Sequence, residues 1–107
     1  MKTAELTRHA LDWAVARVEF VGTLPLRIVS GVIYTVEGDN WNPSTDWAQG
    51  GPIIEREKIS VLAPVRGLWR SRKNGRTQYG PTPLIAAMRC YVASKLGDEV
   101  EIPQELL

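Results

Sequence analysis

The stretch TPLIAAMRCYVASKLG, residues 82–97, is the clearest helix in the chain and decides the fold. Thr82 is a good N-cap because its side-chain oxygen accepts from free N–H groups of the first turn. Pro83 suits the first helical position, and Gly97 suits the left-handed residue after a helix. Helical periodicity places one apolar face on Leu84, Ile85, Met88, Tyr91, Val92 and Leu96, and puts Ala86, Cys90 and Ala93 on the other side. The stretch predicts a helix over 82–96 with one buried face.

The composition is that of a soluble globular protein. The chain has 107 residues, of which 44% are hydrophobic and 23% charged, and we expect one domain over 1–107. No apolar run reaches membrane-spanning length, and charges in the first twenty residues exclude a signal-peptide core. The single cysteine cannot form an internal disulfide, which suits a reducing cytoplasm. These features predict a cytoplasmic protein with no membrane partner.

The remaining segments predict a second helix and several strands. Residues 3–20 read as an amphipathic helix capped by Thr3 and ended by Gly22, with Arg8, Asp12 and Glu19 on its polar side. Residues 25–36 are rich in β-branched residues, with a bulge or bend expected at Gly31. We also expect a strand over 59–63 that Pro64 closes, and a short strand over 98–102.

Residues 68–80 predict a hairpin. Asn74-Gly75 is the favoured two-residue turn because both positions must accept positive φ. With that turn, Lys73 faces Arg76, Arg72 faces Thr77, and Arg70 faces Tyr79. Alternation then places Leu68, Arg70, Arg72, Thr77 and Tyr79 on one face of the hairpin, and Trp69, Ser71, Lys73, Arg76 and Gln78 on the other. The predicted fold is therefore α+β: a small antiparallel sheet of about four strands, including the 68–80 hairpin, covered by two helices over 3–20 and 82–96.

Residues 41–57 are the least regular part of the chain. We expect a short helical turn through Gln49 that Gly50-Gly51 stops, and a second turn beginning at Pro52. The segment is expected to shield part of the second side of the sheet.

Two blocks of sequence, together with the opening segment, resemble a known family. The blocks are WNPSTDWAQGGPIIERE (41–57) and GPTPLIAAMR (80–89), the latter continuing to GDEV (97–100), and the opening segment is KTAELTRHALDWAVA (2–16). They resemble small phage and prophage proteins related to the NinX product of lambdoid phages, over about residues 2–103. The resemblance implies a bacterial or phage origin and a cytoplasmic location. It supplies no catalytic residue, because the family has no assigned function.

Charge is segregated along the chain. Residues 58–97 hold eight basic residues and no acidic one, whereas all 12 acidic residues lie elsewhere. The candidate binding residues for nucleic acid or an acidic partner are Arg66, Trp69, Arg70, Arg72, Lys73, Arg76 and Tyr79. Two interpretations without a binding role are also open. The hairpin is solvated, and its like charges deter pairing at the sheet edge, or its positive charge is compensated within the protein by the acids Asp98, Glu99, Glu101 and Glu105.

A second candidate is the loop that carries Trp41, Asp46 and Trp47. Its two tryptophans could form a recognition surface with a rigid aromatic anchor. Alternatively, both rings plug the open side of the sheet, and Asp46 only favours a helix N-terminus.

Motifs for catalysis and cofactors are absent. We interpret His9, the only histidine, as a surface residue paired with Glu5, and Cys90 as a packed or half-exposed inert thiol. No metal-ligand spacing or phosphate-binding glycine loop occurs, so no metal and no cofactor are predicted. A carboxylate pair that could serve a hydrolase remains open among Asp39, Asp46, Glu55 and Glu57.

These observations predict a non-enzymatic accessory protein that works by binding a protein partner. The alternative is a nucleic-acid-binding module that uses the basic hairpin, and the third hypothesis is a small hydrolase. The oligomeric state is left open.

Overall fold

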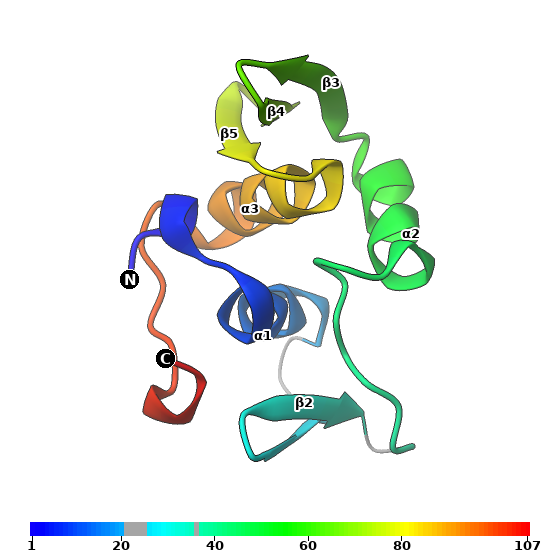
Figure 1. Ribbon diagram of the computed structural model, residues 1–107, viewed down its shortest axis with the longest axis vertical. Helices are drawn as coiled ribbons and strands as arrows, with labels where there is room; N and C mark the ends of the chain where they lie inside the picture. The colour runs from blue at the N-terminus through cyan, green and yellow to red at the C-terminus, as the bar shows by residue number, and fades with distance from the viewer. Residues whose placement is uncertain (21–25, 36) are drawn as a thin grey trace.

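The structure is a computed structural model that describes residues 1–20, 26–35 and 37–107. The expected helix end at Gly22 and the ends of the extended segment at 25 and 36 lie outside the described residues. In chain order (Figure 1) the elements are η1 Thr3–Glu5, α1 Arg8–Glu19, β1 Leu26–Val29, β2 Val32–Thr35, α2 Trp47–Glu57, β3 Ser60–Val65, β4 Leu68–Lys73, β5 Arg76–Gly80, α3 Pro83–Leu96 and η2 Gln104–Leu106.

The strands form two separate antiparallel sheets. One pairs β1 with β2, and the other has the order β3-β4-β5. Helix α3 packs on the larger sheet, and α1 lies between α3 and the β1-β2 hairpin (Figure 1). The α+β class is confirmed, but the single sheet of about four strands is wrong. Ser30 and Gly31 have φ of 52° and 79°, so they form a tight turn that folds β1 back on β2.

Helix α3 begins and ends where the sequence predicts. The Thr82 hydroxyl accepts from the Ile85 N–H at 3.1 Å, and the Gly97 N–H donates to the Ala93 carbonyl at 3.0 Å. The helix is buried on two sides and not on one as expected, because Ala86, Cys90 and Ala93 are buried as well. They face the larger sheet, which makes α3 the central layer of the molecule.

Small residues let the sheet approach α3 closely. A Cβ at Gly80 would lie 2.7 Å from the Ala86 nitrogen, so only glycine fits at the end of β5. The hydroxyl of Ser71 is buried and donates to the Ala86 carbonyl. The contact between β4, β5 and α3 is therefore specified by side-chain size.

The first helix is shorter than predicted. Thr3 does not cap it: the residue is buried, and its hydroxyl donates to the Gly97 carbonyl at 2.7 Å. The regular helix begins at Arg8, and Leu6 ahead of it enters the core. The expected strand over 98–102 is also wrong, since that segment forms only an isolated bridge between Lys2 and Glu99.

Residues 47–57 form one continuous helix, α2, so the predicted stop at Gly50-Gly51 is wrong. The Asp46 carboxylate caps α2 by accepting from the Ala48 N–H at 2.9 Å. Gly50 serves packing, because a Cβ there would collide with the Pro43 carbonyl and the Leu84 side chain. Helix α2 packs beside α3 and leaves the second side of the larger sheet uncovered (Figure 1), contrary to expectation.

The larger sheet is a meander joined by two tight turns. Strand β3 continues through Pro64, with a register shift between Leu62 and Val65, so the predicted closure at Pro64 is wrong. Arg66 and Gly67 then adopt φ of 57° and 81°, which closes β3 onto β4.

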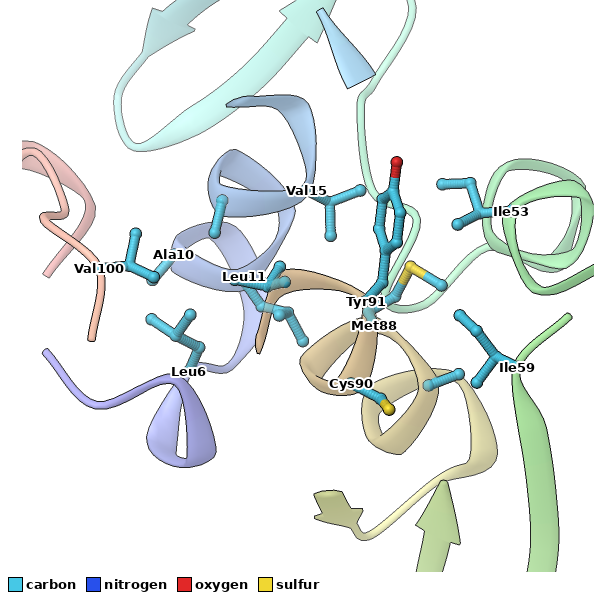
Figure 2. Close-up of a cluster of buried hydrophobic side chains, with 13 residues drawn as sticks. Leu6, Ala10, Leu11, Val15, Ile53, Ile59, Met88, Cys90, Tyr91 and Val100 are labelled. Atoms are coloured by element: carbon cyan, nitrogen blue, oxygen red, sulfur yellow. The ribbon is translucent and has the colours of Figure 1, made fainter. Parts of the chain in front are cut away.

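The hydrophobic core lies around α3 and α1 (Figure 2). Its larger members include Leu6, Leu11, Val15, Ile53, Ile59, Met88, Tyr91 and Val100. Burial of each such aliphatic side chain stabilises the fold by about 1.5–3 kcal/mol before entropy costs. The core joins α1 and α3 to the middle of α2 and to the C-terminal segment, and it holds one side of the larger sheet in place.

Candidate functional site

The β4-β5 hairpin forms as the sequence predicts. Asn74 and Gly75 have φ of 52° and 78°, as this two-residue turn requires. The predicted pairs Lys73–Arg76, Arg72–Thr77 and Arg70–Tyr79 are all found. Opposed residues share a face, so the hairpin divides the seven basic and aromatic candidates between two sides of the sheet.

The inner face of the sheet, which packs on α3, takes three of the candidates. Lys73 is largely buried and donates from Nζ to the Glu57 carbonyl at 2.8 Å, and the same nitrogen lies 3.4 Å from Glu57 Oε1. Arg76 forms an ion pair with Asp98 at 2.9 Å, and Trp69 is half-buried. Lys73 and Arg76 therefore connect the hairpin to the end of α2 and to the segment after α3.

Glu57, at the end of α2, is the residue that Lys73 contacts. Its carboxylate also lies 2.9 Å from Arg56 Nε and 3.5 Å from Lys95 Nζ. The hydrogen bond from Arg56 is the main reason that the pKa of Glu57 is lowered, so this carboxylate stays ionised. Glu57 therefore serves as a counter-ion for neighbouring cations.

The opposite side of the sheet, here called the outer face, carries Arg70, Arg72 and Tyr79, and Arg66 lies in the β3-β4 turn at one end of it. Arg66, Arg70, Arg72 and Tyr79 are all exposed. Three large aliphatic side chains lie among them, with exposed fractions of 40% for Leu62, 75% for Val65 and 47% for Leu68, and Tyr79 itself is 51% exposed. Cross-strand pairing joins Leu62 to Arg70 and Val65 to Leu68, so the apolar and basic groups are direct neighbours.

Within the described parts of the chain, the positive charge on the outer face has no internal counter-ion. Among the described residues, Arg66, Arg70 and Arg72 form no ion pair. Of the four C-terminal acids considered as compensating charges, Asp98 alone forms an ion pair in the described structure, with Arg76 on the inner side. Internal compensation thus reaches the inner face and leaves the outer face positive.

A shallow hollow of about 60 Å³ lies in the outer face. It is lined by Ala63, Val65, Leu68, Arg70 and Tyr79. Its walls are apolar at the end near the β3-β4 turn and carry a guanidinium at the other end. The hollow can therefore take a small apolar group placed beside an anion.

The second candidate group is Trp41, Asp46 and Trp47, in and beside the loop before α2, and its members do not form one surface. Trp41 is half-buried: its Nε1 donates to the Asp12 carbonyl at 2.8 Å, and its ring meets Phe20 edge-on at 5.1 Å. Asp46 caps α2. Both residues have structural roles. Asp46 matches its structural interpretation as a helix cap, whereas Trp41 packs against α1 and Phe20 and does not cover the open side of the sheet.

Trp47 is the member of this group that faces water, with 56% of its surface exposed. It borders a pocket of about 200 Å³ between the loop and the start of α3. Thr45, Thr82, Pro83 and Ile85 line the same pocket, which is mainly apolar.

Asp12 is a buried carboxylate that sequence reasoning missed. It is 2% exposed, and its Oδ1 accepts from the Ser44 N–H at 2.8 Å. Burial raises the pKa of Asp12 to about 6, although hydrogen bonding from Ser44 acts in the opposite direction. Helical periodicity placed Asp12 on the polar side of the first helix, so no sequence signal marked it. Asp12 fixes the loop before α2 against α1.

The single-residue candidates for catalysis do not assemble. His9 is half-buried with an unpartnered Nδ1, and its expected pairing with Glu5 is not among the contacts of the described residues. Cys90 is fully buried against the hairpin, and burial raises the pKa of its thiol (Figure 2). Within the described part of the chain, no cluster of three metal-ligating side chains occurs.

Sequence reasoning also missed the apolar residues of the outer face, Leu62 and Val65, and found only Leu68 among them. Treating Pro64 as the end of a strand hid the continuation to Val65 and the Arg66-Gly67 turn. A two-residue turn between Val65 and Leu68 would have placed both on one face, beside Arg70.

The geometry defines an α+β protein with a helix-covered sheet whose second side is a solvent-facing, basic and apolar surface. A family model described as bacteriophage P22 NinX matches residues 2–95, so the chain belongs to this NinX family. The resemblance inferred from the sequence is thereby confirmed. A search of curated proteins finds no match. Among the described residues, no helix is long and apolar enough to cross a membrane.

Proposed function

We propose that this protein is a non-enzymatic phage accessory protein of the cytoplasm, and that it acts by binding another protein through the outer face of β3-β4-β5. The observation that carries the proposal is the exposure of four large apolar side chains among three arginines. Contiguous exposed apolar groups are typical of interaction sites, and interfaces are enriched in tyrosine and arginine.

The face of the sheet supports this role better than its β3 edge. Strands β3 and β5 are the two edge strands of the sheet, and a strand added at the β3 edge would have to pair with β3. Pro64 lacks an N–H donor, and the register shift beside it distorts the strand. Both features are typical of edges protected against pairing. A partner is therefore expected to pack on the side chains of the outer face.

The nucleic-acid alternative has less support from the side chains. Trp69 points to the α3 side, so Tyr79 is the one aromatic candidate left on the outer face to stack a base. Val65 and Leu68 would lie against phosphates without gaining an apolar contact. The basic groups alone would bind nucleic acid without sequence preference and in a strongly salt-dependent manner.

Site-specific photocrosslinking in host cells tests the proposed function. A photoreactive residue in place of Leu68 should give a discrete protein adduct, and the same residue in place of Arg27, exposed on β1, should not. The adduct should disappear when Arg70→Ser and Arg72→Ser are added. Equal adducts from both positions, or an adduct unaffected by the two substitutions, would contradict the proposal. An adduct to nucleic acid instead of protein would favour the alternative.

A further inference from the structure

We infer that the partner of the outer face is an extended acidic segment of another protein, with one aliphatic side chain followed by carboxylates two and four residues later. This inference rests on the proposed function and specifies the chemistry of the same surface. It follows from the order and the spacing of side chains along β4.

Strand β4 presents an apolar group and then two cations on one face. Leu68, Arg70 and Arg72 alternate along the strand, so their side chains project from the outer face at intervals of about 7 Å. Leu68 lies opposite Val65 at the turn end, and Arg72 lies between Ser60 and Thr77 at the polar end. The surface thus has a direction, from apolar to basic.

The apolar end offers a fixed anchor point. The hollow of about 60 Å³ is bounded by Val65 and Leu68 on one side and by Arg70 and Tyr79 on the other. In this measure about 10–15 Å³ admits one water molecule, so the hollow takes the end of an aliphatic side chain. An anion that follows on the same side of the partner segment would reach the Arg70 guanidinium.

Charge decides which class of protein surface can cover this face. A second copy packed symmetrically on it would bring the arginines of one copy against those of the other, and like charges in an interface are strongly unfavourable. An acidic partner would instead pair each guanidinium with a carboxylate, with two parallel hydrogen bonds to each.

Spacing then selects the conformation of the acidic segment. An extended chain projects every second side chain to the same side at intervals of about 7 Å, the same interval as that of the β4 residues. An aliphatic residue seated in the hollow therefore places the carboxylates two and four positions later over Arg70 and Arg72. Carboxylates one and three positions later point away from the sheet.

Two labelled synthetic peptides of equal composition test the inference by fluorescence anisotropy on the full chain. One has a leucine followed by glutamates two and four residues later, and the other has its glutamates one and three residues later. The first peptide should bind at least about tenfold more tightly, because both carboxylates reach a guanidinium. Equal binding of the two peptides would overturn the inference.

Matched variants locate the binding on the protein. Arg72→Ser should weaken binding of the first peptide about tenfold, and Arg27→Ser, a change of the same type on β1, should leave it unchanged. Equal loss in both variants would overturn the inference, since it would indicate nonspecific attraction to a cation. Circular dichroism of both variants shows whether the fold is retained.

The outcomes separate this inference from the proposed function. A protein adduct from position 68, combined with no binding of either peptide, refutes the acidic extended segment and retains protein binding. Salt-sensitive binding of a single-stranded oligonucleotide that Arg70→Ser abolishes refutes both.

Discussion

At the residue scale, Asp12 shows how a single buried carboxylate affects the whole protein. Its charge is desolvated, and the hydrogen bond from the Ser44 N–H compensates for only part of the cost. The folded state therefore holds the Asp12 proton more tightly than the unfolded state does. This contribution to stability is fully present below the ordinary pKa of 3.8 and is lost as the pH rises through about 6.

Asp12→Asn should remove this pH dependence. The amide oxygen still accepts from the Ser44 N–H, and no charge has to be buried. We expect the variant to be more stable than the wild type above pH 6 by about 1–3 kcal/mol, with a smaller difference near pH 4. Urea unfolding at the two pH values measures the difference. The control is Asp39→Asn in an exposed turn, and an advantage for Asp12→Asn that does not grow with pH would contradict the prediction.

At the element scale, local rules of sequence explain the parts of the fold that were predicted correctly. Thr82, Pro83 and Gly97 determine the ends of α3, and Asn74-Gly75 determines the register of the hairpin, because both depend on neighbours in sequence. Long-range contacts decided the rest. Gly50-Gly51 reads as a helix stop in isolation, but Gly50 is required where α2 meets Pro43 and Leu84.

The two adjacent glycines of α2 provide a matched test of this interpretation. Gly50→Ala should destabilise the protein by about 1–3 kcal/mol, because the new Cβ collides with the Pro43 carbonyl. Gly51→Ala should stabilise it by about 0.5–1 kcal/mol, since a Cβ there would lie 3.7 Å from Trp47 and alanine favours a helix. Thermal unfolding of the two variants measures the contrast. Similar effects of both substitutions would mean that Gly50 is not needed for packing.

At the scale of the whole molecule, the basic residues of the segment 58–97 fall into two groups: cations that contact other parts of the fold and cations that face solvent. The inner cations contact the fold: Lys73 and Lys95 meet Glu57, Arg76 meets Asp98, and Arg89 donates to the Tyr79 carbonyl at 2.7 Å. The cations of the outer face project away from α3. Composition predicted the excess of positive charge, but only the register of the larger sheet shows which cations are free.

The candidate site was therefore predicted in part. The alternation along β4 correctly separated Arg70 and Arg72 from Trp69 and Lys73. Which face would be covered could not be derived, because that depends on where α2 and α3 pack in three dimensions. The tryptophan loop illustrates the same limit: Trp41 and Trp47 are six residues apart, and one is half-buried while the other is exposed.

The comparison of Lys73→Ser with Arg72→Ser tests the division into two faces most directly. The residues are neighbours on β4, and their side chains point to opposite sides of the sheet. We predict that Lys73→Ser lowers the free energy of unfolding by about 1–2 kcal/mol, because it removes the hydrogen bond to Glu57, and that Arg72→Ser changes it by less than about 0.5 kcal/mol. Equal losses in urea unfolding, or a larger loss for Arg72→Ser, would contradict a free outer face.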